Sequence, residues 1–164
     1  MRHKHDPSKT LVGFVVGDVT YAVRIDGVRE ITNPLNVIAL PRSLPHIVGV
    51  SDYRGEIVPV VDLRVRFGLP PARTDLRAKW IIVSVGAHFA ALVVDTVTEV
   101  FGTAGAGLKP APALGSGDEI RGIMGATTHD GTLVFVLDTA SFRDITELAL
   151  ARASVPPQLD GSRS

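Results

Sequence analysis

The sequence predicts an all-β protein with short helices, built from two similar units that each close into a small barrel. First, segment 12–31 aligns without a gap onto 81–100, at a constant offset of 69 positions that places Glu30 on Glu99. Second, 45% of the 164 residues are hydrophobic but only 5% are aromatic, which indicates a core of aliphatic, strand-favouring side chains. Third, the apolar runs are short and separated by turns, which favours barrels because closure removes exposed sheet edges.

The first copy begins after a polar segment, 1–10, that we expect to be flexible. Apolar residues alternate on both sides of Gly17-Asp18, which predicts a β hairpin. Residues 28–31 form another short apolar run. Prolines on both sides of 36–40 predict a further isolated strand there.

The first copy ends with two strands and a short helix. The strands are predicted near 47–50 and 57–61, joined by a tight connection at Arg54-Gly55. Pro59 lacks a backbone donor and therefore predicts an edge or bulged position for the second strand. Asp62 is suited to cap a helix over the next few residues.

The second copy starts at Trp80 after a linker. Gly49-Val50 is matched to Gly122-Ile123, and a Gly, Ala and Pro-rich connector spans 103–117. The last strand, 132–137, matches 57–61 of the first copy.

A helix follows that strand. We expect one face to carry Phe142, Ile145, Leu148 and Ala149, with Ser141 and Asp144 as a capping box. These elements place the folded domain at 11–152 and a disordered, Pro- and Gly-rich tail at 153–164.

The composition excludes several classes of function. Seventeen basic and seventeen acidic residues give zero net charge, whereas nucleic-acid-binding proteins usually show a basic excess. Cysteine is absent, so disulfides and thiolate metal sites are excluded. No apolar run has the length of a membrane span or follows the N-terminus as a signal peptide would, so we expect a cytoplasmic protein.

No catalytic, cofactor or metal site is predicted. The five histidines show no paired ligand spacing, although His3 and His5 could bind metal adventitiously. The chain has neither a Gly-x-Ser-x-Gly nucleophile turn nor a phosphate-binding loop. Asp26 and Asp95 occupy equivalent places in the two copies, and duplicated turn residues explain them more simply than a catalytic pair. The residues alone therefore favour a non-enzymatic module that binds other proteins.

The segment 49–67, GVSDYRGEIVPVVDLRVRF, resembles the signature of the CheW family of bacterial chemotaxis coupling proteins. YAVRIDGVREI at 21–31 and LVVDTVTEV at 92–100 are similar to two further family segments, and the resemblance covers about residues 10–150 in order. It implies two pseudosymmetric five-stranded SH3-like β barrels packed around a shared core, with a C-terminal helix.

The resemblance also implies a function and partners. CheW-like proteins are adaptors without catalytic activity. They link the cytoplasmic tip of methyl-accepting chemoreceptors to the regulatory domain of the histidine kinase CheA. We therefore expect recruitment to receptor arrays, membrane contact only through the receptor, and a monomer in isolation.

Carried over to this chain, the resemblance implies a receptor-facing set of residues: Val28, Glu30, Gly49, Val50 and Arg54. Val28 and Val50 are expected to line an apolar groove for a receptor helix. Gly49 would let that helix come close, because it has no side chain. Arg54 would form a charge-assisted hydrogen bond with a receptor polar group or with Glu30.

The kinase-facing set is expected on an exposed barrel edge of the second copy: Val83, Val85, Leu92 and Val94. One departure from the family signature is Ser51-Asp52-Tyr53, where the family commonly has Asn-Leu before Arg-Gly. Asp52 and Tyr53 are expected either to change which receptor is accepted or to pair internally with Arg54.

Three alternatives stay open at this point. One is a divergent copy in a non-flagellar chemosensory pathway, with only one partner surface functional. Another is a regulatory domain of the CheV or CheA type, disfavoured because too little sequence follows the last matching segment for a receiver or kinase domain. The third is a small-ligand-binding β barrel, which requires a polar-lined cavity.

Overall fold

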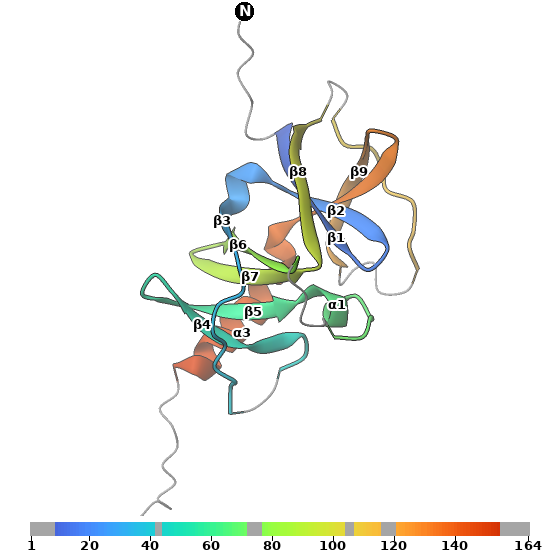
Figure 1. Cartoon of the computed structure of the whole chain (residues 1–164). Coiled ribbons are helices and arrows are strands. Elements are labelled where there is room, and N and C mark those ends of the chain that lie inside the picture. Colours follow the sequence, from blue (N-terminus) through green and yellow to red (C-terminus); the bar gives the residue numbers. More distant parts are fainter. Residues whose placement is uncertain (1–8, 42–43, 72–76, 104–106, 116–120, 155–164) are drawn as a thin grey trace, which may run out of the picture.

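The computed structural model describes residues 9–41, 44–71, 77–103, 107–115 and 121–154 (Figure 1). Ten strands form two five-stranded sheets, one above the other in Figure 1, and the helices are short. The predicted all-β class and the two five-stranded units are therefore confirmed. No helix in these ranges combines the length and apolar character needed to cross a bilayer.

Sheet A has the strand order β8-β1-β2-β10-β9. Its strands are β8 (Thr96–Gly102), β1 (Thr10–Val16), β2 (Val19–Arg24), β10 (Thr132–Leu137) and β9 (Ile123–His129). Neighbours are antiparallel except β2 and β10, which run parallel.

Sheet B has the strand order β3-β6-β7-β5-β4. Its strands are β3 (Val28–Thr32), β6 (Lys79–Val85), β7 (His88–Val94), β5 (Glu56–Asp62) and β4 (Ile47–Tyr53). Here β5 and β7 form the parallel pair. Sheet B thus repeats the order and pairing of sheet A with the two copies interchanged.

Each sheet mixes both copies, so the expectation that each copy closes its own barrel is wrong. β1 and β2 of the first copy pair with β8 to β10 of the second, and β6 and β7 pair with β3 to β5. The chain crosses between sheets twice. A 3-10 turn, η2 (Ile25–Gly27), leads from β2 into β3, and Asp95 leads from β7 into β8. These crossings make the two units interdependent.

The strand register also corrects one pairing of the repeat. Ile47 and Gly49 flank a shift in register opposite β5, and Ile123 and Gly125 flank the equivalent shift opposite β10. Gly49 is therefore equivalent to Gly125 and not to Gly122. Gly122 precedes β9 at a positive φ of 71°.

One hydrophobic core joins the two sheets, as the resemblance implied. It includes fully buried Phe14 and Tyr21 from sheet A together with Ile81 and Leu92 from sheet B. Burying each side chain of this size stabilises the fold by about 1.5–3 kcal/mol. A smaller cluster inside sheet B contains Trp80, and a smaller cluster inside sheet A contains Leu11, Ala22, Phe101, Val134 and Val136.

The first predicted helix is confirmed as α1 (Leu63–Arg66). The Asp62 carboxylate accepts hydrogen bonds from the backbone N–H groups of Arg64 and Val65. α1 follows β5 at the side of sheet B (Figure 1).

The second helical region begins with η3 (Thr139–Phe142) and continues as α3 (Arg143–Ala153). The predicted capping box of Ser141 and Asp144 is wrong, because Asp138 caps η3 instead and α3 has no side-chain cap. The predicted apolar face is wrong in part. Leu148 is exposed, whereas Thr146 takes a fully buried position.

Two further expectations from the sequence differ from the structure. Segment 36–40 forms no strand, because only Ile38 pairs, as an isolated bridge to Val50. Pro59 is not on an edge strand, since β5 lies between β7 and β4. Pro59 immediately precedes Val60, the residue at which the parallel pairing of β5 with β7 begins. The predicted flexible start and tail lie largely outside the described residues, as do parts of the connector 103–117.

Candidate functional site

The two edge strands of sheet B meet at a cluster that we call the first seam, formed by Glu30, Tyr53 and Arg54. Glu30 lies on β3, Tyr53 ends β4, and Arg54 follows in the turn. The Tyr53 hydroxyl donates a hydrogen bond of 2.6 Å to Glu30 Oε1. Arg54 Nε donates to the same oxygen at 3.1 Å, and Arg54 Nη2 lies 2.9 Å from it. The predicted pairing of Arg54 with Glu30 is present, on one carboxylate oxygen.

Charge and packing fix the position of Arg54. The hydrogen bond from the Tyr53 hydroxyl, helped by the Arg54 charge, holds the pKa of Glu30 below its ordinary value, although desolvation opposes this shift. Glu30 in turn raises the pKa of Arg54. The guanidinium lies over the Tyr53 ring, 5.6 Å from its centroid. The Arg54 side chain is nevertheless 67% exposed and open to a partner.

The turn that carries Arg54 explains the Ser51-Asp52-Tyr53 departure. Arg54 and Gly55 both have positive φ, 52° and 86°, as two-residue hairpin turns require. Asp52 Oδ1 accepts the Gly55 N–H at 2.9 Å and stabilises this turn, rather than bonding Arg54. The internal pairing expected for this segment therefore comes from Tyr53.

A segment that crosses β4 occupies the surface expected for a receptor helix at Gly49. Ile38 N–H donates to Val50 O at 2.7 Å, and the Ser51 hydroxyl donates to Asn36 O at 2.7 Å. A Cβ atom at Gly49 would lie only 2.4 Å from the Ile38 carbonyl oxygen. Gly49 is therefore required by the close approach of this chain's own segment.

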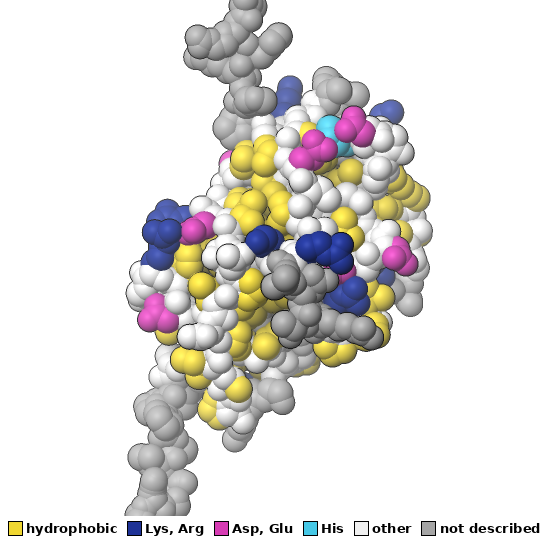
Figure 2. All heavy atoms as spheres, viewed as in Figure 1, with side chains coloured by type: hydrophobic (Ala, Val, Ile, Leu, Met, Phe, Trp, Pro, Cys, Tyr) yellow, Lys and Arg dark blue, Asp and Glu magenta, His cyan; other side chains and the backbone are white. Residues whose placement is uncertain are grey.

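The expected apolar groove is not lined by Val28 and Val50. Val50 is only 5% exposed beneath the crossing segment, and Val28 is half-buried against the shared core. Ile31 is exposed on this sheet, together with five apolar side chains that the sequence analysis did not single out: Leu35, Val37, Ile38, Val48 and Ile57. The sequence signal for Leu35, Val37 and Ile38 was the proline-flanked run after β3. Figure 2 shows hydrophobic side chains reaching the surface over both sheets.

The side chains expected on an exposed edge for the kinase are buried. Val83, Val85, Leu92 and Val94 are at most 2% exposed and belong to the shared core. The expected exposure is wrong because β6 and β7 are interior strands of sheet B. The apolar residues of β6 and β7 are therefore a sign of buried strands and not of an exposed edge.

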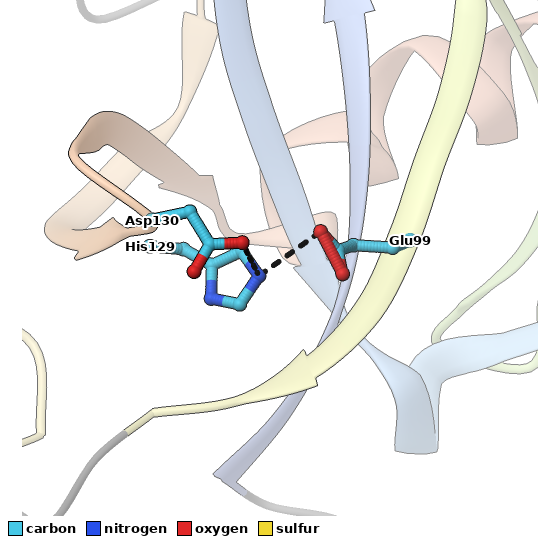
Figure 3. Close-up of side chains that lie close together, drawn as sticks. All are labelled: Glu99, His129 and Asp130. Carbon is cyan, nitrogen blue, oxygen red and sulfur yellow. Dashed lines mark ion pairs between the residues drawn. The ribbon is translucent and has the colours of Figure 1, made fainter.

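The edge strands of sheet A meet at an equivalent second seam, formed by Glu99, His129 and Asp130 (Figure 3). Glu99 lies on β8, His129 ends β9, and Asp130 follows in the turn. His129 Nε2 lies 3.1 Å from Glu99 Oε1 and 3.5 Å from Asp130 Oδ2. One potential metal-ligand atom from each residue lies within 4.8 Å of the others. Sequence reasoning missed this group because its members are distant in the chain.

Sheet A also repeats the exposed apolar positions of sheet B. Val100, Met124 and Leu133 are 52%, 41% and 41% exposed. By strand register and repeat, they are equivalent to Ile31, Val48 and Ile57. Each barrel therefore presents apolar side chains on its outer surface.

An ion pair links the two sheets away from both seams. Arg64 Nε and Nη2 donate to the two Asp95 carboxylate oxygens at 2.8 Å each. The Gly17 N–H, from the β1–β2 turn, also donates to Asp95, at 2.9 Å. These groups lie in the wall of a cavity of about 600 Å³. The polar groups Arg64 and Asp95 bind each other there, which gives the ligand-binding alternative no support.

Comparison with known proteins gives concordant results. The family of CheW-like domains matches residues 10–145. A chemotaxis protein CheW of Rhizobium meliloti is 26% identical over 140 residues, covering 85% of this chain and 90% of that protein. Protein FrzA of Myxococcus xanthus is 28% identical over 147 residues, covering 90% and 91%.

A solved structure is similar in fold. The crystal structure of the scaffolding protein TtCheW from Thermoanaerobacter tengcongensis matches with a TM-score of 0.72 and 27% identity. The match covers 80% of this chain and 89% of that one.

Proposed function

The chain belongs to the CheW-like domain family, and on that premise we propose that it is the adaptor between a chemoreceptor and a histidine kinase of the CheA type. The observation that carries this function is the family match over 10–145, on a fold that it shares with a scaffolding protein. The protein is a scaffold and not an enzyme. Its contact with the membrane is through the receptor, to whose arrays it is recruited.

The receptor surface is the first seam together with the exposed apolar side chains of sheet B. Arg54 offers a guanidinium that Tyr53 and Glu30 hold in place, which lowers the entropy lost on binding. Ile38, 60% exposed, supplies an apolar anchor of the kind an amphipathic helix buries. Among the five residues implied by the resemblance, Glu30 and Arg54 would contact the receptor directly.

The other three residues of that set act indirectly. Val50 pairs with Ile38, and Gly49 leaves room for it. Val28 starts β3, which carries Glu30. Their contribution is therefore to hold the crossing segment and the edge strand in the conformation that a receptor helix meets.

The kinase surface lies on sheet A, at the exposed positions Val100, Met124 and Leu133. An adaptor needs two separate faces, and the duplicated barrels present one exposed apolar set each. Contacts of this kind are reversible, with micromolar dissociation constants that correspond to about 8 kcal/mol per interface. The protein itself is a monomer when neither partner is present.

Direct binding tests these assignments with a matched pair of variants. Binding of a receptor cytoplasmic fragment and of a CheA regulatory domain would be measured by calorimetry for Ile38→Ser and for Met124→Ser. We expect Ile38→Ser to weaken receptor binding at least about tenfold, and Met124→Ser to weaken kinase binding similarly. Loss of both partners in one folded variant, or unchanged binding in both variants, would contradict the two-surface assignment.

A further inference from the structure

We propose that the second seam is a binding site for a divalent transition-metal ion such as Zn²⁺, with Glu99 Oε1, His129 Nε2 and Asp130 Oδ2 as ligands. This inference stands on the geometry of sheet A and does not depend on receptor coupling. It concerns a chain with no cysteine, in which metal binding must use imidazole and carboxylate groups.

The three ligand atoms are already spaced as a zinc site requires. Bonds of about 2.0–2.2 Å in tetrahedral geometry place neighbouring ligand atoms roughly 3.4 Å apart. The His129 nitrogen lies 3.1 Å and 3.5 Å from the two carboxylate oxygens. All three atoms fall within 4.8 Å of one another, so only small side-chain movements would complete the site.

The His129 Nε2 atom is buried and has no hydrogen-bond partner among the described residues. It lies at ion-pair distance from both carboxylates, but neither contact has hydrogen-bond geometry. Figure 3 shows both carboxylates directed at this one nitrogen. The nitrogen and the two carboxylate oxygens therefore converge on one point without a hydrogen bond between them. A metal ion placed there would coordinate all three atoms and balance the two carboxylate charges.

The surrounding structure holds the His129 ring and the Asp130 backbone in place. The His129 ring stacks on Phe101, with centroids 4.0 Å apart and planes 13° apart, and Phe101 is itself buried. Asp130 sits at a positive φ of 50° in the turn with Gly131. Such preorganisation reduces the entropy that metal binding must overcome.

The comparison with the first seam gives an electrostatic reason for an external cation. In the first seam the Glu30 carboxylate is neutralised by the Arg54 guanidinium. In the second seam Asp130 stands at the position equivalent to Arg54, so two carboxylates flank His129 where the first seam has one carboxylate and one cation. A bound divalent ion would restore the charge balance that the first seam carries within the chain.

The ligand types select the class of ion. Imidazole with carboxylates suits zinc and its first-row neighbours, whereas Ca²⁺ and Mg²⁺ prefer sites made of oxygen alone. Glu99 and Asp130 are exposed, which leaves the remaining coordination positions to water.

Zinc titration of the full chain, free of any affinity tag, tests the site. The background variant carries His3→Ala and His5→Ala, which removes two N-terminal imidazoles able to bind metal. Competition with a chromophoric chelator then gives the stoichiometry and affinity for this background and for added His129→Gln or Asp130→Asn. Asn tolerates the positive φ of the turn, so Asp130→Asn should fold normally. Glu30→Gln in the first seam is the matched control.

We expect one zinc ion per chain in the background, weakened more than about a hundredfold by His129→Gln, because even groups behind metal ligands change affinity 10–100-fold. Asp130→Asn should weaken binding as well, and Glu30→Gln should not. Ca²⁺ should not compete. Absence of zinc binding in the background, or binding that His129→Gln leaves unchanged while the far-ultraviolet circular dichroism shows a folded protein, would overturn the proposal.

Discussion

The two seams share the same arrangement of strands and turn, but their turn residues carry opposite charges. Each joins the edge strands of one sheet through a glutamate on the first edge and a ring at the end of the last edge, followed by a residue-glycine turn with positive φ. The first seam ends in Arg54 and is neutralised internally. The second ends in Asp130 and has two carboxylates around His129.

Comparison of the two seams distinguishes the residues that the fold requires from those expected to determine partner binding. Features present in both copies, such as the Gly49 and Gly125 positions and the register shifts beside them, serve closure of the barrel. The residue at the turn differs between the copies and points away from the core. Partner choice is therefore expected to depend on the turn residues and the exposed apolar positions, rather than on the barrel itself.

The largest expected effect compares Gly49, below the segment that carries Ile38, with Gly125, below an equivalent segment whose Lys109 pairs with Ala126 as Ile38 pairs with Val50. A Cβ atom at Gly49 would meet the Ile38 carbonyl oxygen at 2.4 Å, whereas one at Gly125 would meet Leu108 Cβ at 2.9 Å. We expect Gly49→Ala to lower the free energy of unfolding by about 3 kcal/mol and Gly125→Ala by about 1 kcal/mol, because the overlap at Gly49 is deeper than that at Gly125, where the nearest backbone atom, the Lys109 carbonyl oxygen, lies at 3.2 Å. Urea denaturation measures both. Equal losses would show that the two segments are equally rigid.

The next effect compares two aspartates at equivalent places in the repeat. Asp95 accepts hydrogen bonds from both Arg64 nitrogens and from the Gly17 N–H, and so joins the sheets. Asp26 is exposed and has no comparable ion pair in the described part of the chain. Asp95→Ala should cost about 2–3 kcal/mol of unfolding free energy and Asp26→Ala less than about 0.5 kcal/mol. Thermal denaturation of the pair checks this, and a large loss for Asp26→Ala would contradict it.

The smallest expected effect concerns the pKa of Glu30, which depends on the hydroxyl of Tyr53 at the end of β4. In Tyr53→Phe the ring stays in its cluster but the hydrogen bond to Glu30 is lost, so the pKa of Glu30 should rise toward its ordinary value of 4.5. A lowered carboxyl pKa stabilises the fold above pH 4.5, and that stabilisation is lost as the pH falls through the folded-state pKa. The variant should therefore lose less stability on acidification than the wild type.

Carboxyl NMR titration of Glu30 measures this shift directly. His129→Gln, at the equivalent position of the second seam, is the control and should leave the Glu30 pKa unchanged. An unchanged Glu30 pKa in Tyr53→Phe would show that Arg54, rather than the hydroxyl, governs this carboxylate.

Much of the fold follows from local sequence. The Gly17-Asp18 and Arg54-Gly55 turns, the Asp62 cap and the strand 132–137 were all predicted, because turn residues and alternation act over a few positions. The exchange of strands between the copies was not predicted. The repeat shows which strands are alike, but it cannot show which of two like partners each will pair with.

The site was predictable only in part, for a related reason. Glu30 and Arg54 were singled out, and they do pair. The other residues predicted to contact a partner are buried or half-buried. Val83 and Leu92 look like an open edge in sequence and are interior, because alternation alone does not distinguish a central strand from an edge. The cluster of Glu99 with His129 depends on closure of sheet A, which no local pattern reveals.

Receptor coupling is assigned to the first seam and not to the second. The most direct test is a pull-down of cytosolic partners with wild type, Arg54→Ala and the second-seam control Asp130→Asn, quantified by mass spectrometry. We predict that wild type and Asp130→Asn recover both a chemoreceptor and a histidine kinase, whereas Arg54→Ala recovers the kinase alone. Receptor recovered equally by all three proteins, or a kinase recovered without receptor by the wild type, would contradict this assignment of the receptor surface.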